Sequence, residues 1–178
     1  MENIEIKPVT KNDVADLQKI SIQTFTETFA AYNTEENMAK YLREFLSFGK
    51  LSEELDNAYS TFYFATLNNS IIGYVKLNFS NAQTELQDSN GMEIERIYVL
   101  QEYFGKSVGQ VLFEKARQVA EEKNLHYMWL GVWEKNPRAI SFYKKNGFIE
   151  FDKHIFKLGE DEQTDIMMKK ILNNGKSV

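Results

Sequence analysis

The stretch that decides the fold spans residues 93–110. It begins Glu93-Ile94-Glu95-Arg96-Ile97-Tyr98-Val99-Leu100 and continues through a turn with glycines at positions 105 and 109. The first half is typical of a strand, and the turn opens an amphipathic helix whose apolar side carries Val108, Leu112, Ala116, Val119 and Ala120. Backbone N–H groups at a helix N-terminus bind phosphate through unpaired amides and the helix dipole. The stretch therefore predicts a site for a phosphate-bearing ligand.

The alternation of a strand sets the expected faces of this segment. It predicts that Ile94, Arg96 and Tyr98 point one way, and that the other face carries Glu93, Glu95, Ile97 and Val99. The hydroxyl of Ser107 is expected to cap the following helix, and Asn124 is expected to end it.

Two common phosphate loops do not match the turn. A nucleotide P-loop would need a glycine at position 100 to precede Gly105-Lys106-Ser107, but that residue is Leu100. A dinucleotide fingerprint needs Gly-x-Gly-x-x-Gly, whereas three residues separate Gly105 from Gly109. From the turn alone, a strand-turn-helix whose glycines serve only packing is an equally good interpretation.

A second block follows a buried strand predicted over residues 127–133. Asn136 is a good N-cap, Pro137 suits the first helical position, and Gly147 stops the short helix. Ala139, Ile140 and Tyr143 fall on one side of that helix, and residues 148–156 are predicted to form another strand.

Together these blocks resemble the Gcn5-related N-acetyltransferase (GNAT) superfamily. They are residues 93–120 and the pattern Asn136-x-x-Ala139-x-x-Phe142-Tyr143-x-x-x-Gly147-Phe148. The resemblance implies acetyl-CoA as cosubstrate and no metal, with the pyrophosphate on the turn amides and the pantetheine arm between two splayed parallel strands. The family pattern Gln/Arg-x-x-Gly-x-Gly/Ala is only partly met, since Phe104 and Ser107 depart from it and Gly109 matches. Lys106 is expected to compensate in part.

A narrower similarity extends over most of the chain. Residues 73–76, 93–98, 130–136 and 158–165 are similar to the Pai-type polyamine N-acetyltransferases of Gram-positive bacteria. This similarity implies acetyl transfer to a primary amine of spermidine or spermine by direct attack in a ternary complex. Two alternatives stay open, namely N-acetylation of proteins or peptides, and a non-catalytic acetyl-CoA-binding regulatory protein.

The resemblance assigns cofactor-binding positions to specific residues. They are Ile97, Tyr98, Val99, Gly105, Lys106, Ser107, Val108, Gly109, Gln110, Asn136 and Tyr143. The amide of Val99 is expected to polarise the thioester carbonyl, and the phenol of Tyr143 to protonate the leaving thiolate. The alternative for Tyr143 is an ordinary core tyrosine on an amphipathic helix.

The base candidates are Glu93 and Glu95, because a primary ammonium with a pKa near ~10.4 must lose a proton before it attacks. The alternative is that both carboxylates lie on a solvated strand face or pair with Lys76. His126 and His154 are weaker base candidates. For a cationic acceptor, the expected substrate-binding residues are Glu27, Tyr32, Glu160 and Asp161.

Composition limits the classes of function. The chain has 178 residues, 43% of them hydrophobic, which fits a single domain over residues 1–172 with a loose tail at 173–178. It has no cysteine and two histidines, which argues against a metal site, and its net charge of −5 fits a cationic substrate and disfavours nucleic acid. Without a signal peptide or a membrane-length apolar stretch, the expected location is the cytosol, away from the membrane. The oligomeric state is left open, with a homodimer as one option.

The expected fold class is α/β of mixed type with the GNAT architecture. It has a central, mostly antiparallel sheet of about seven strands, a splayed parallel central pair, and helices on both faces. The remaining elements are expected as strands over 4–7, 61–67, 71–79 and 165–171, a helix over 12–29, a helix capped by Thr34, and a short helix over 51–58.

Overall fold

A computed structural model of the chain describes residues 3–172, so the expected tail at 173–178 lies outside the described residues. The strands are β1 (Glu5–Pro8), β2 (Ser60–Leu67), β3 (Ser70–Phe79), β4 (Gly91–Val99), β5 (Tyr127–Trp133), β6 (Ile149–Leu158) and β7 (Asp161–Ile171). The α-helices are α1 (Val14–Phe29), α2 (Glu35–Phe45), α3 (Phe48–Asp56), α4 (Val108–Glu122) and α5 (Pro137–Lys145). Short 3₁₀ helices are η1 (Lys11–Asp13), η2 (Ala30–Tyr32), η3 (Ser80–Ala82) and η4 (Gln101–Tyr103).

The strands form one seven-stranded sheet in the order β1-β2-β3-β4-β5-β7-β6. Its neighbours are antiparallel except β4 and β5, which pair in parallel at Gly91, Met92 and Glu93. Beyond Glu93 the two strands separate, so the sheet is open between the carboxyl halves of β4 and β5. The predicted mixed sheet with a splayed parallel pair is confirmed.

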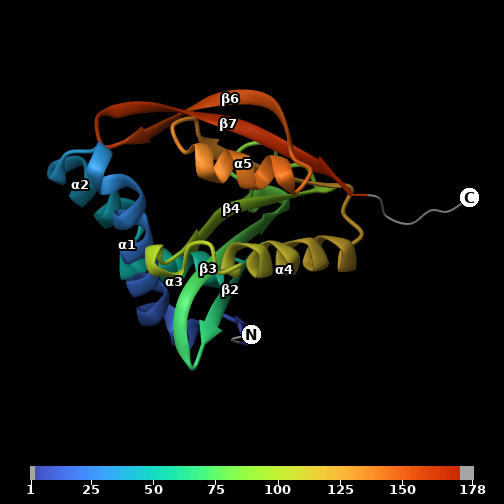
Figure 1. Cartoon of the computed structure of the whole chain (residues 1–178), viewed down its shortest axis with the longest axis horizontal. Helices are drawn as coiled ribbons and strands as arrows, with labels where there is room; N and C mark the ends of the chain where they lie inside the picture. The colour runs from blue at the N-terminus through green and yellow to red at the C-terminus, as the bar shows by residue number, and fades with distance from the viewer. Residues whose placement is uncertain (1–2, 173–178) are drawn as a thin grey trace, which may run out of the picture.

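Helices cover both faces of the sheet, as predicted (Figure 1). On one face α4 and α5 lie side by side, and the stripe expected on α4 is buried against β3, β4 and β5. On the other face α1, α2 and α3 enclose a second cluster, which includes Leu17, Phe25 and Tyr74. Each helix therefore buries one apolar stripe, the arrangement in which a sheet hides both of its faces.

Local sequence patterns account for several helix ends and for one turn. The Thr34 hydroxyl accepts a hydrogen bond from the N–H of Asn37, and the Asn136 side chain accepts one from Ala139. In the β2–β3 hairpin, Asn68 and Asn69 both have positive φ, the conformation that a tight two-residue turn requires.

Two boundary predictions and one capping prediction are wrong. Helix α3 begins at Phe48 because Ser47 caps it, and β7 begins at Asp161 because a tight hairpin at Gly159 lets the strand pair with β6 along its whole length. Ser107 precedes α4 in a left-handed conformation (φ 63°), so its hydroxyl makes no capping bond.

The predicted alternation along β4 is also wrong, because the strand contains a β-bulge. Lys76 lies opposite Arg96 and Leu77 opposite Ile94, so Glu95 is an extra residue in β4. Ile94, Ile97 and Val99 consequently pack on the α4 side, while Tyr98 packs on the α1 side. Glu93 and Glu95 do stay together, since the amide nitrogen of Asn78 donates to both carboxylates.

Residues 3–172 contain no helix that is both long and apolar enough to cross a membrane. The same residues bring together no group of three or more side chains suited to hold a metal ion. The cytosolic location and the lack of a metal stay predictions.

Candidate active site

A cavity of about 700 Å³ lies where β4 and β5 separate, between α4 and α5. Most of the residues predicted to bind the cofactor line it, as does one of the two base candidates. They are Glu95, Ile97, Tyr98, Val99, Gly105, Ser107, Val108, Gly109, Gln110, Asn136 and Tyr143. The two sequence blocks, distant along the chain, therefore form opposite walls of one cavity.

The turn before α4 directs backbone donors into this cavity. The first bond of the helix is donated by Val111 to the carbonyl of Ser107, so within the described chain Val108, Gly109 and Gln110 supply the free N–H groups of the first turn. Gly105 has φ +77°, which favours glycine, and a Cβ at Gly109 would meet only the ring of Phe142, at 3.9 Å. The turn thus has room for a phosphate beside the helix N-terminus.

A positive side chain reaches the same region from α5. The guanidinium of Arg138 lies 3.4 Å from the centroid of the Phe104 ring, and both residues line the cavity. Lys106, which was expected to offset the loss of a polar residue at position 104, lies over the ring of Tyr103 and outside the cavity lining. The structure therefore places the charge of Arg138, rather than that of Lys106, on the cavity wall.

The exposed edge of β4 supplies a second set of backbone groups. The N–H of Leu100 donates to Ile72 of β3, so by alternation the amides of Val99 and Ile97 face the gap toward β5. Such an unpaired strand edge can hold an extended amide-containing chain as a further strand would. The pantetheine arm of coenzyme A has that form, so the residues present fit the ligand.

Tyr143 lies in the last turn of α5, where its ring contacts Phe142 and Phe148 edge-on. It lines the cavity although only 7% of its surface is exposed. Burial raises the pKa of Tyr143 well above that of an ordinary phenol, against a smaller lowering by Arg138. The phenol is therefore protonated near neutral pH, as a general acid must be.

Glu95 belongs to a buried charge cluster. Burial alone would raise the pKa of Glu95, but the charges of Arg96 and Lys76 outweigh it and lower the pKa to about 2. Glu54 of α3 completes the cluster with a bidentate pair to Arg96 at 2.8 and 3.1 Å and a contact to Lys76 at 3.2 Å. Glu95 is thus a fixed anion at the cavity wall.

Glu93 lies outside the cavity lining, and its carboxylate is fully engaged. It accepts hydrogen bonds from the N–H of Thr84 at 2.8 Å, the hydroxyl of Thr84 at 2.5 Å and the amide of Asn78 at 3.1 Å. Burial raises the pKa of Glu93, although these hydrogen bonds lower it in part. These hydrogen bonds hold the η3–β4 loop against strands β3 and β4.

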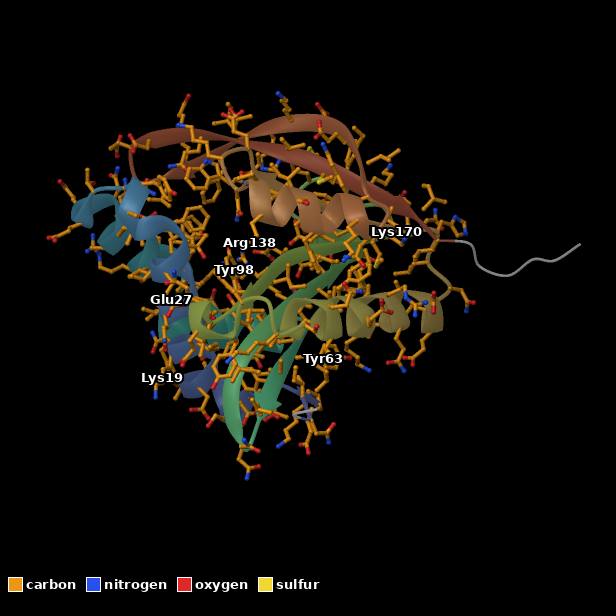
Figure 2. The ribbon with its side chains drawn as sticks, in the orientation of Figure 1. Lys19, Glu27, Tyr63, Tyr98, Arg138 and Lys170 are labelled. Carbon is orange, nitrogen blue, oxygen red and sulfur yellow. The ribbon has the colours of Figure 1, made fainter. Side chains whose placement is uncertain are left out.

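The four residues predicted to bind the acceptor do not all lie together. Tyr32 and Asp161 line a second cavity of about 260 Å³, which shares Trp133 with the first. Glu27 lies outside both linings, and its carboxylate accepts the N–H of Gln101 at 2.8 Å. Glu160 is exposed and pairs with Lys40 at 3.0 Å. Figure 2 shows Arg138, Tyr98 and Glu27 in turn between α5 and α1, inward of α2.

Two features that the sequence interpretation passed over carry local signs of function. Arg138 is in the first turn of α5, where the helix dipole disfavours a cation, so its presence there calls for a functional reason. Gly131 interrupts an otherwise bulky strand, a position that often marks a close approach of a ligand.

These features fit a CoA-dependent acetyltransferase site, and comparison with known proteins shows the family. Residues 16–148 match the Acetyltransferase (GNAT) family, and the chain belongs to that family. It is 40% identical over 172 residues to the uncharacterised N-acetyltransferase in the pepI 3′ region of Lactobacillus delbrueckii subsp. lactis, covering 97% of this chain and 99% of that one.

Two further comparisons are with proteins of Thermoplasma acidophilum. Over 172 residues the chain is 27% identical to a spermidine N(1)-acetyltransferase of Thermoplasma acidophilum, covering 94% of this chain and 97% of the relative. The crystal structure of a PaiA N-acetyltransferase from Thermoplasma acidophilum in complex with coenzyme A superposes with a TM-score of 0.79 at 26% identity, covering 96% and 99% of the two chains. The predicted family, its acetyl-CoA cosubstrate and the acetyltransferase activity are confirmed.

Proposed function

We propose that this acetyltransferase transfers the acetyl group to a primary amine of a polyamine such as spermidine or spermine. The observation that carries the proposal is the second cavity, which adjoins the first at Trp133 and combines aromatic and anionic walls. Tyr32 stands edge-on to Trp133 at 5.1 Å, and Glu134, Asp161 and Glu162 supply carboxylates, against one cation, Lys135. Aromatic faces and carboxylates are the groups that bind ammonium ions.

An unpaired acceptor atom in the same cavity supports this assignment. The side-chain nitrogen of Gln163 donates to Asn33 at 3.0 Å, whereas its oxygen is buried and has no hydrogen-bond partner among the described residues. A buried oxygen without a donor is costly unless a ligand or water satisfies it. An ammonium group in this cavity would supply that donor. The spermidine N(1)-acetyltransferase relative points to the same class of acceptor.

We propose that the chain's own groups act in the following way. The first-turn amides of α4 and Arg138 hold the phosphates, and the β4 edge orients the extended arm between the splayed strands. When bound, acetyl-CoA supplies the activated acetyl group as a thioester. The Val99 amide polarises the carbonyl, the neutral amine attacks directly, and Tyr143 gives its proton to the departing sulfur.

The test is a steady-state survey of acceptors that measures release of free thiol. We expect spermidine and spermine to exceed a monoamine with a neutral tail in kcat/KM, and their KM to rise with ionic strength as salt screens the distal charges. Equal kcat/KM for the monoamine, with no effect of salt, would overturn the polyamine assignment. Turnover of lysine peptides alone would move the acceptor to proteins, and coenzyme A binding without any turnover would indicate a regulatory protein.

A matched set of variants locates the distal charges. Asp161→Asn and Glu162→Gln should each raise the KM for spermidine by about tenfold, equivalent to ~1.4 kcal/mol, with kcat nearly unchanged. Glu53→Gln removes the same charge from an exposed position on α3, outside both cavities, and should leave KM unchanged.

A further inference from the structure

The proton of the acceptor ammonium needs a destination that the two predicted carboxylates do not provide. Glu95 is paired with both Lys76 and Arg96, and Glu93 accepts three hydrogen bonds outside the cavity. A carboxylate held by two cations is a weak base, because protonation would leave both cations unpaired. The proton must therefore pass to a different group. Candidates lie on the side of β5 that faces away from α4 and α5.

Three titratable side chains from distant segments meet on that side. Nε2 of His154 (β6) lies 3.4 Å from Oδ2 of Asp165 (β7), and Nδ1 of the same ring lies 3.1 Å from Oε1 of Glu85 in the η3–β4 loop. Nδ1 is buried and has no partner with hydrogen-bond geometry among the described residues. The imidazole thus lies between two carboxylates, with Nε2 on the side of Asp165. A proton taken up between Oδ2 and Nε2 can be shared by the two groups.

Gly131 opens the way from the cavity to this pair. It lines the main cavity, and a Cβ added there would stand 3.1 Å from Cε1 of His154 and 3.3 Å from Oδ2 of Asp165. Gly131 follows Trp129, the last β5 residue that pairs with β4, by two positions, so it lies where the two strands have separated. The pair is thus separated from the reaction gap by the one residue of β5 without a side chain. Neither residue of the pair belongs to the cavity lining, but the His154 side chain is 24% exposed, so a water can contact it.

Resting on the proposed amine acetylation, we propose that the Asp165–His154 pair, reached over Gly131, takes the proton that the acceptor ammonium must lose. The N–H bond of the ammonium breaks, its proton moves to Oδ2 of Asp165 and is shared with Nε2 of His154, and the electron pair left on nitrogen forms the bond to the acetyl carbon. The C–S bond then breaks and Tyr143 protonates the sulfur. The second proton of the attacking nitrogen restores the phenol through water, and the pair releases its own proton to solvent.

The surroundings of the pair suit this role. Burial raises the pKa of Asp165 to about 6, although the neighbouring imidazole lowers it in part, and a base that titrates near the working pH is the most effective one. Glu85 is the charged group that faces the ring from the loop, and Asp165 is the one from β7. On β6, the exposed Asp152 lies two residues away, and β5 presents only Gly131.

The experiment compares Asp165→Asn and His154→Gln with wild type in profiles of kcat/KM for spermidine between about pH 5.5 and 10. Both variants should lose roughly 10²-fold at pH 7, lose the rise near neutral pH, and recover at alkaline pH, where free amine is present. Calorimetry should show unchanged coenzyme A affinity. His126→Gln changes the other histidine, exposed at the start of β5, and Asp16→Asn changes an exposed aspartate of α1; both should behave as wild type.

The outcomes separate this proposal from the proposed function. If wild type acetylates spermidine while both variants keep its pH profile, the role of the pair is overturned and the acetyltransferase function stands. If only a lysine peptide is acetylated, the same profiles are taken with that peptide. If no amine is acetylated, both proposals fall. Should either variant fail to fold, Gly131→Ala, which covers Oδ2 without removing a titratable group, must show the same loss of the neutral-pH rise.

Discussion

The guanidinium of Arg138 stacks on the ring of Phe104, 3.4 Å from its centroid, and joins α5 to the turn before α4 across the main cavity. Among the described residues no carboxylate pairs with Arg138, and burial lowers its pKa. An arginine that is partly removed from water and lacks an anion is poised to bind one. The phenylalanine that departs from the family pattern thus holds a cation where the family places a polar side chain.

Arg138→Gln should weaken coenzyme A binding by about tenfold, equivalent to ~1.4 kcal/mol, because it removes a charge-assisted contact to phosphate. Phe104→Leu should weaken binding less, since it loosens the guanidinium without removing it. Calorimetry at two salt concentrations checks both. Arg117→Gln, on the solvent face of α4, is the control of equal charge and should bind as wild type. Unchanged coenzyme A affinity in Arg138→Gln would show that this arginine does not bind the phosphates.

Gly109→Glu should abolish measurable coenzyme A binding in a folded protein. The present glycine has only Phe142 near its Cβ direction, so a glutamate side chain fits the fold but places negative charge where the helix end receives phosphate. Gly49→Glu is the matched control, because a Cβ there would meet nothing within 4 Å and the site lies on α3. A Gly109→Glu protein that binds coenzyme A normally would show that the phosphate site is elsewhere.

Tyr143→Phe should lower kcat by roughly 10²-fold and leave coenzyme A affinity nearly unchanged, since the ring still packs against Phe142 and Phe148. The measurement is kcat under conditions in which chemistry limits turnover, with thermal unfolding as the check on folding. An unchanged kcat would show that Tyr143 is an ordinary core tyrosine and not the general acid.

Glu95→Gln should lower the free energy of unfolding at pH 7 by about 3 kcal/mol, the value that corresponds to a pKa of about 2 in place of 4.5. Because the folded pKa lies below the unfolded one, this contribution is complete above about pH 4.5 and disappears as the pH falls toward 2. Urea unfolding at pH 7 and pH 3 should therefore show a smaller difference between variant and wild type at the lower pH. A difference independent of pH would mean that Glu95 stabilises the bulge by shape alone.

The sequence allowed us to predict the features that are determined by residues close together in the chain, such as helix ends. Asn136, Pro137 and Gly147 fix the ends of α5 locally, and so the wall that carries Tyr143 was predictable. The bulge at Glu95 was not, because it depends on how Lys76 and Leu77 pair with β4. A period-two pattern has no means of showing one extra residue.

Local sequence patterns were equally unable to predict which side chains from distant segments lie together. Glu85, His154 and Asp165 come from a loop and two strands, and they meet only because β6 and β7 form a hairpin beside β5. The predicted acceptor residues were similarly divided, since Tyr32 and Asp161 line one cavity while Glu160 is occupied by Lys40. They were chosen for residue types that suit a cationic ligand, but which of them lie together depends on the fold.

The most direct test of polyamine acetylation is to quantify both products of a single reaction with acetyl-CoA and spermidine. Mass spectrometry measures N-acetylspermidine, and a thiol reagent measures free coenzyme A. We predict that the two appear in equal amounts, that they depend on spermidine, and that both fall together in Tyr143→Phe. Release of coenzyme A without acetylated spermidine, or no release although coenzyme A binds, would contradict the proposed function.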